Sequence, residues 1–156
     1  MKFYEITKSE YDKSNLQSKN YRTDATMKKN QSDALVFFGA TGDLAYKKVF
    51  PAIQTLIQHN HLDVPVVGVA KAGWTMEQFQ ARARDSLEKH GGIDEAAFAK
   101  LVKLLRYVDG DYNDLATFKQ LRQTLENAAR PIHYLAIPPS LFGTRAADLQ
   151  HPEELR

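Results

Sequence analysis

The sequence contains no cysteine, which excludes disulfide bonds, thiolate nucleophiles and cysteine-ligated zinc or iron–sulfur centres. It also has no apolar run that approaches the roughly 18 residues of a membrane-spanning helix. The N-terminal segment lacks the apolar stretch of a secretory signal. These absences predict a cytoplasmic protein that makes no contact with a membrane.

A strong excess of one charge is missing too, because 21 Lys and Arg residues stand against 19 Asp and Glu residues. With a net charge of only +2, nucleic acid is not an expected partner. Residues 1–31 hold seven basic and four acidic side chains and show no hydrophobic periodicity. They are therefore predicted to form a polar, disordered leader.

The 156 residues suffice for one domain with a buried core, since 43% are hydrophobic and 26% are charged. Short apolar segments alternate with longer amphipathic ones. The expected strands are 34–38, 64–70, 106–110 and 131–137, and the expected helices are 43–59, 76–89, one from 94, and one from 113 or 114 to 128. This alternation predicts an α/β fold, a Rossmann-like parallel sheet with helices on both faces, incomplete at about four strands.

The segment GATGDLA, residues 39–45, joins the first expected strand to the first expected helix. Gly39 allows a sharp turn, Gly42 lets backbone approach a pyrophosphate, and Ala45 lets the helix pack closely on the sheet. The free amides and the positive end of the helix would then face phosphates. Asp43, in the first helical turn, is expected to cap the helix. The spacing departs from G-x-G-x-x-G, so the prediction depends on the position between strand and helix, and an unoccupied turn is the alternative.

The residue after the second expected strand bears on the choice of cofactor. A carboxylate there would bind the ribose 2′-hydroxyl of NAD, whereas a cation would accept the 2′-phosphate of NADP. The chain has Lys71 at this place and no acidic residue before Glu77. Lys71 therefore favours NADP, with a solvated surface lysine as the alternative. Lys48, one turn into the first helix, is a second cation that could reach a phosphate or a substrate.

Three segments together resemble the N-terminal coenzyme domain of glucose-6-phosphate dehydrogenase. They are FFGATGDLAYKKVFPAI (37–53), VVGVAKAGWT (66–75) and HYLAIPPSLFGT (133–144). The resemblance covers residues 32–144 and implies a dinucleotide-binding domain over that range, with NADP as cofactor. It also implies an oxidoreductase of the pentose phosphate pathway that converts glucose 6-phosphate to the 6-phosphogluconolactone, and that forms homo-oligomers when full-length.

The resemblance also implies individual site residues. The loop would contact the dinucleotide through Gly39, Ala40, Thr41, Gly42, Asp43, Leu44, Ala45 and Tyr46. Lys71 falls where the family commonly has an arginine for the 2′-phosphate, and Lys48 falls on a lysine near coenzyme and substrate. The remaining implied contacts are Asp111 and Tyr112 on the adenine side and Pro138 and Pro139 on the nicotinamide side.

The chain departs from the family in two ways. The E-K-P-F-G strand motif and the R-I-D-H-Y-L-G-K helix motif, which carries the general base, are absent, so no catalytic residue is assigned. His133 in HYL lacks the flanking residues of that motif and is expected to be an ordinary strand histidine. No metal ligands are assigned either. Residues 145–156 no longer follow the family pattern and are expected to be an unrelated tail.

On these grounds the chain is predicted to be the NADP-binding portion of such a dehydrogenase, inactive by itself, with glucose 6-phosphate bound only by a full-length protein. The alternative is a non-catalytic dinucleotide-binding or interaction module. An independent short-chain reductase would need a Y-x-x-x-K pair beyond the fourth strand, and the chain has this spacing only at Tyr4 and Lys8.

Overall fold

Four parallel strands form one sheet at the centre of the computed structural model, which describes residues 31–138. The strands are β1 (Ala34–Phe38), β2 (Val66–Ala70), β3 (Leu105–Asp109) and β4 (Pro131–Leu135). Their order across the sheet is β3-β2-β1-β4, and every neighbouring pair is parallel. This is the first part of the 3-2-1-4-5-6 order of a dinucleotide-binding fold. The Rossmann-like α/β fold predicted from the sequence is therefore confirmed.

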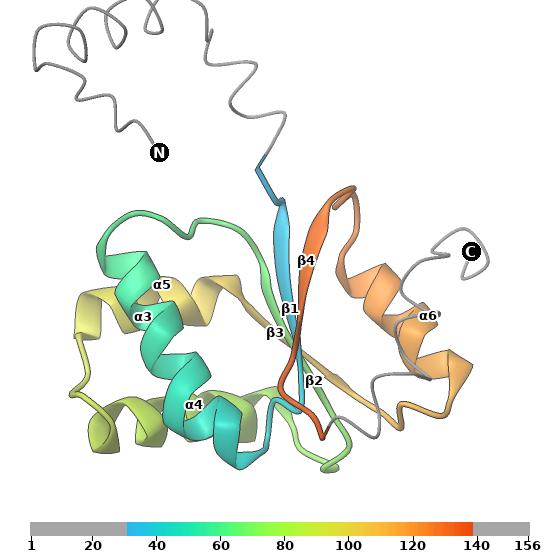
Figure 1. Cartoon of the computed structure of the whole chain (residues 1–156), viewed down its shortest axis with the longest axis horizontal. Coiled ribbons are helices and arrows are strands. Elements are labelled where there is room, and N and C mark those ends of the chain that lie inside the picture. The colour runs from blue at the N-terminus through green and yellow to red at the C-terminus, as the bar shows by residue number, and fades with distance from the viewer. Residues whose placement is uncertain (1–30, 139–156) are drawn as a thin grey trace, which may run out of the picture. The chain divides into compact units, whose positions relative to one another are not determined.

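Helices cover both faces of the sheet, as Figure 1 shows. The π-helical segment η1 (Ala45–Val49) continues into α3 (Phe50–Gln58), which packs with α4 (Met76–Lys89) and α5 (Glu95–Leu104) against one face. On the opposite face, α6 (Leu115–Thr124) packs through Phe118 and Leu121. Both faces of β1 and β2 are buried, which is why their sequences are apolar throughout.

The ends of the elements follow local signals closely. Thr75 caps α4 in a reciprocal pair with Gln78, and Asp94 and Asp114 cap α5 and α6.

Several elements differ in length from the expected ranges. The α6 helix ends at Thr124 rather than at Ala128, because Glu126 has a left-handed φ of 50° and turns the chain back. The strands β2 and β4 are also shorter than expected, and β3 starts one residue early at Leu105, directly after α5.

Pro51 lies where the first expected helix divides into η1 and α3. It lies in the first turn of α3, and η1 precedes it with a bond from the Phe50 N–H to the Ala45 carbonyl. Because proline has no N–H, the carbonyl of Tyr46 needs another donor, and the fully buried Ser86 hydroxyl of α4 provides it. The π-helical turn is thus stabilised by Ser86, a residue that the sequence periodicity did not identify.

Strand β4 has a neighbour on its β1 side only, among the residues that the structure describes. Ile132 and Tyr134 pair with Leu35 and Phe37, so they point to the face that α3, α4 and α5 cover over the other strands. On β4 that cover is missing in the described part, and the two side chains are 53% and 46% exposed. Ile137, in contrast, lies beyond the strand and is buried against α6 residues.

An apolar strand edge of this kind invites pairing with another chain. We expect the purified chain to self-associate at tens of micromolar, and Ile132→Lys to shift it toward the monomer in size-exclusion chromatography with light scattering. Leu115→Lys is the matched control, because Leu115 on α6 is 51% exposed but lies away from the edge. A monomeric wild-type chain, or equal effects of the two variants, would contradict this expectation.

Candidate functional site

The carboxyl ends of the four strands meet at one edge of the sheet, where the loops after them are joined by backbone hydrogen bonds. The amides of Gly39 and Ala40 donate to the Val69 carbonyl at 3.0 and 3.2 Å. Gly110 donates to Ala70 at 2.9 Å, and Ala136 donates to Phe38 at 3.0 Å. The phosphate-loop candidate after β1 therefore lies between the loops that follow β2 and β4, which is the ligand-binding position of this class of sheet.

Gly39 has a backbone requirement that only glycine meets. Its φ is +76°, and a Cβ atom there would overlap the Ala136 carbonyl oxygen and lie 2.9 Å from the carbonyl carbon. The backbone after β4 thus lies in close contact with the start of the loop. Gly39 therefore serves a close approach between two backbones in addition to the turn that the sequence indicated.

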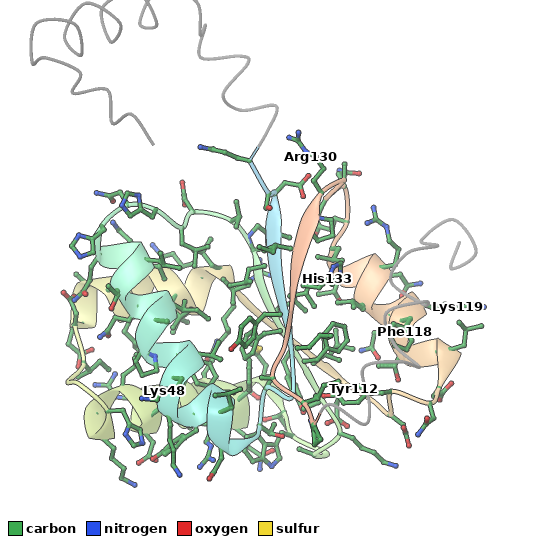
Figure 2. The ribbon with its side chains drawn as sticks, viewed as in Figure 1. Lys48, Tyr112, Phe118, Lys119, Arg130 and His133 are labelled. Atoms are coloured by element: carbon green, nitrogen blue, oxygen red, sulfur yellow. The ribbon has the colours of Figure 1, made fainter. Side chains whose placement is uncertain are left out.

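The Tyr112 hydroxyl braces the base of this loop. It accepts a hydrogen bond from the Gly39 N–H at 2.7 Å and donates one to the Val69 carbonyl at 3.0 Å. The ring packs edge-on against Phe38 at 5.7 Å between centroids, and burial raises the pKa of the hydroxyl. Figure 2 shows Tyr112 near the carboxyl ends of the strands. This bracing role was not foreseen, and the predicted contact between Tyr112 and adenine stays a prediction.

The loop leads directly into a helical turn whose first residues face solvent. Gly42, Asp43 and Leu44 are exposed, whereas Ala40 and Ala45 are fully buried and Thr41 is half-buried. The first amides of a helix have no partner within the helix, so exposed ones can bind an anion. Asp43 forms an ion pair with Lys47, with 3.0 Å between Oδ2 and Nζ. This contact lowers the pKa of the Asp43 carboxyl.

Tyr46 and Lys48, the last two candidates on this segment, differ in their surroundings. The Tyr46 hydroxyl donates to Asp85 on α4, and the Arg82 guanidinium lies 3.8 Å from the centre of the Tyr46 ring. The Tyr46 side chain is thus committed to the η1–α4 contact. Lys48 is exposed and forms no ion pair or hydrogen bond with the described part of the chain (Figure 2).

Lys71 follows β2 and forms an ion pair with Asp111, with 2.8 Å between Nζ and Oδ2. Its side chain is 71% exposed, so a ligand can reach the ammonium group. The hydrogen bond to Asp111 raises the pKa of Lys71, and the same bond lowers the pKa of Asp111. Sequence reasoning placed both residues at this edge but gave no sign that they pair.

Asp109 is a site residue that the sequence did not reveal. One of its carboxylate oxygens accepts hydrogen bonds from the amides of Ala72 and Gly73, at 2.9 and 2.8 Å, and from the Tyr107 hydroxyl at 2.7 Å. Burial alone would raise the pKa of Asp109, but these bonds outweigh it and lower that pKa. The carboxylate therefore fixes the loop that carries Lys71. An acidic residue at the carboxyl end of a strand was the available signal.

The residues after β4 are only partly described. Pro138 is exposed, and Pro139 lies outside the described residues, as do residues 1–30 of the expected leader and all of the expected tail.

His133 lies midway along β4 (Figure 2), and its ring centre is 6.2 Å from that of Phe38. Burial lowers the pKa of its imidazole. It is a strand histidine, as expected, and does not lie at the carboxyl edge.

Residues 31–138 show neither a metal-binding cluster nor a membrane-spanning helix. No group of three or more histidine, aspartate or glutamate side chains in this range could hold a metal ion. No helix in the same range is long and apolar enough to cross a membrane.

Comparison with known proteins now adds independent information. The model of the family "Glucose-6-phosphate dehydrogenase, NAD binding domain" matches residues 36–155, which is more than half of the chain. The match extends past residue 144, where an unrelated tail was expected to begin, and that boundary stays a prediction.

Curated relatives have the same character. Glucose-6-phosphate 1-dehydrogenase 1 of Mycobacterium tuberculosis is 41% identical over 111 residues, which cover 71% of this chain and 24% of the relative. Glucose-6-phosphate 1-dehydrogenase of Saccharomyces cerevisiae is 31% identical over 140 residues, covering 82% of this chain and 28% of the yeast protein. The chain thus spans about a quarter of the length of these relatives.

Among solved structures, glucose-6-phosphate 1-dehydrogenase from Mycobacterium avium superimposes with a TM-score of 0.73 at 37% identity. A glucose-6-phosphate dehydrogenase in complex with its substrate glucose-6-phosphate superimposes with a TM-score of 0.70 at 26% identity. These alignments cover 79% of this chain and 27% and 28% of the two solved chains. With the parallel β3-β2-β1-β4 sheet and the glycine loop after β1, they lead to one conclusion: the chain belongs to the glucose-6-phosphate dehydrogenase family and corresponds to its N-terminal NAD-binding domain.

Proposed function

We propose that the chain binds NADP at the carboxyl edge of its sheet, as the coenzyme-binding portion of a glucose-6-phosphate dehydrogenase. The observation that carries the proposal is the loop from Gly39 to Ala45, which turns out of β1 beside the β2 and β4 loops and starts a helix whose first turn is exposed. The residues fit a dinucleotide, because the exposed first turn of a helix, with its positive end, can receive a pyrophosphate. The contacts of the loop residues and of Lys48, Asp111, Tyr112, Pro138 and Pro139 with the cofactor are part of this proposal.

Lys71 supports NADP rather than NAD. Its ammonium follows β2, where the second strand of this fold class meets the ribose of the cofactor, and it is exposed to an incoming ligand. A positive charge at this place suits the 2′-phosphate. The loop that carries Lys71 itself contains no acidic residue, and its acidic partners, Asp109 and Asp111, come from β3 and the loop after β3.

The reaction of the whole protein is proposed from its relatives. In a longer protein, bound NADP would accept a hydride from glucose 6-phosphate to give the 6-phosphogluconolactone. The described residues contribute binding and orientation of the cofactor to this reaction. The cytoplasm is the proposed compartment, since a relative from Arabidopsis thaliana bears the name "Glucose-6-phosphate 1-dehydrogenase 5, cytoplasmic". Assembly into homo-oligomers is proposed for the full-length protein.

Titration calorimetry with NADP and NAD tests the proposal. We expect Lys71→Ala to weaken NADP binding roughly fivefold to thirtyfold and to leave NAD binding nearly unchanged, because only NADP carries the phosphate that the ammonium contacts. Lys119→Ala is the matched control, since Lys119 is an exposed lysine on α6 (Figure 2). Equal losses for the two cofactors would place Lys71 away from the 2′-phosphate.

A folded wild-type chain that binds neither cofactor would overturn the proposal. The alternative, an interaction module that docks on a separate protein, has no specific observation in its favour. It would gain one if the chain formed a stable complex in which the exposed loop after β1 is protected.

A further inference from the structure

We propose that Asp111 determines cofactor specificity: its carboxylate competes with the 2′-phosphate for Lys71, so that the site discriminates weakly between NADP and NAD. The inference rests on the proposed dinucleotide function and deepens it. It concerns a contact within this chain, the 2.8 Å ion pair between Lys71 Nζ and Asp111 Oδ2.

The ion pair joins two different loops. Lys71 follows β2, and Asp111 lies two residues beyond β3, at the neighbouring strand end. Rossmann-type sites that prefer NAD carry a carboxylate at the end of the second strand. In this chain that position has a lysine, while the next loop brings a carboxylate to the same corner. The corner therefore contains both a cation for phosphate and an anion that repels it.

Asp111 cannot easily move away when a phosphate approaches. Its Oδ1 accepts hydrogen bonds from the backbone and side-chain nitrogens of Asn113, at 2.8 and 3.1 Å. Its carbonyl accepts from the Thr117 hydroxyl at 2.7 Å and from the Asp114 amide at 3.0 Å. The backbone bonds fix the position of Asp111 in the turn before α6, and a swing of its carboxylate would break both bonds from Asn113.

The charges at this corner explain the expected weak preference. The pKa of Asp111 is lowered, chiefly by Lys71, so the carboxylate is ionised at neutral pH. A 2′-phosphate bound to Lys71 must share the ammonium with this fixed negative charge. The other nearby acid, Asp109, is bound by two loop amides and the Tyr107 hydroxyl and adds to the negative field. The benefit of Lys71 to NADP is thus reduced, and NAD, which has no phosphate there, is not penalised.

Asp111→Asn is the decisive variant. Asparagine has the same shape and keeps an oxygen for Asn113, but it removes the negative charge. Glu88→Gln is the matched control, because Glu88 is also a carboxylate paired with a cation, Arg84, and lies in the last turn of α4, at the opposite end of that helix from the Lys71 loop. Both variants change the net charge by one unit.

Dissociation constants for NADP, NAD, 2′,5′-ADP and 5′-AMP are measured by calorimetry on the full chain. The two nucleotides differ only in the 2′-phosphate and isolate that contact. We expect Asp111→Asn to tighten NADP and 2′,5′-ADP binding by roughly threefold to tenfold, and to change NAD and 5′-AMP by less than about twofold. Glu88→Gln should leave the NADP to NAD ratio as in the wild type.

Two outcomes would overturn one or both proposals. An unchanged ratio in Asp111→Asn, or weaker NADP binding, overturns the role of Asp111 while the dinucleotide function stands. A folded wild-type chain that binds none of the four ligands overturns the proposed function itself, and the role of Asp111 with it. If Asp111→Asn has an altered circular dichroism spectrum, Asp111→Ser, which keeps an oxygen acceptor for the turn, gives the same comparison.

Discussion

Gly39→Ala is expected to destabilise the domain by roughly 2–5 kcal/mol. Two costs add in this substitution. A non-glycine residue at a φ of +76° costs about 1–2 kcal/mol, and overpacking against the Ala136 carbonyl adds about 1–3 kcal/mol. Because small domains have only about 5–15 kcal/mol of total stability, this is a large fraction of it. Urea denaturation followed by circular dichroism measures the loss.

Gly73→Ala separates the two costs. Gly73 has a similar φ of +67°, but nothing lies within 4 Å of the position that its Cβ would take. This variant should therefore lose only about 1–2 kcal/mol, the backbone cost alone. If both variants lose the same stability, the close approach between the β1 loop and the chain after β4 does not exist in solution.

Gly68→Ala is expected to cost roughly 2–4 kcal/mol, although φ at this strand residue is unremarkable. A Cβ on Gly68 would overlap the tip of the Phe79 ring and lie 2.9 Å from the Ala40 Cβ. The ring cannot easily give way, since it is fully buried, stacked on Tyr107 at 4.7 Å and bordered by Phe50 at 5.6 Å between centroids. The absence of a side chain at Gly68 thus leaves room for the Phe79 ring of α4.

A double-mutant cycle with Phe79→Leu tests this fit. A shorter side chain at position 79 leaves room for the added methyl group. The double variant should therefore be more stable than the sum of the two single losses predicts, by at least about 1 kcal/mol. Additive losses in urea denaturation would show that the Gly68 position tolerates a methyl group and that the ring has another place to go.

Local signals in the sequence were enough for the element order and for the loop. The apolar run before Gly39 reads as a strand because both its faces are buried, and Thr75 and Asp94 cap helices through bonds within three residues. The glycine loop was found because its residues are contiguous. Lys71 was placed at the cofactor site because it follows a strand, whereas Asp111 and Tyr112 were placed there only by the resemblance to the family.

The side-chain contacts between distant segments could not be predicted from such local signals. The Lys71–Asp111 pair spans 40 residues, the bond between Tyr112 and Gly39 spans 73, and the Ser86 hydroxyl bonds a carbonyl 40 residues away. None of these has a period or a spacing. Each depends on the distance between two segments that are far apart in the chain. Packing of the two hydrophobic cores sets that distance.

The sequence by itself thus determined the α/β class, the parallel strands and the position of the loop, because each follows from local patterns: apolar runs, the alternation of strands with helices, and a contiguous glycine motif. Only the tertiary structure decided that Gly39 must lie against Ala136, that Gly68 must admit Phe79, and that Lys71 is held by a carboxylate. The physical reason is that steric fit and ion pairing depend on distances between segments far apart in the chain. Those distances exist only once the sheet has formed and its helices have packed.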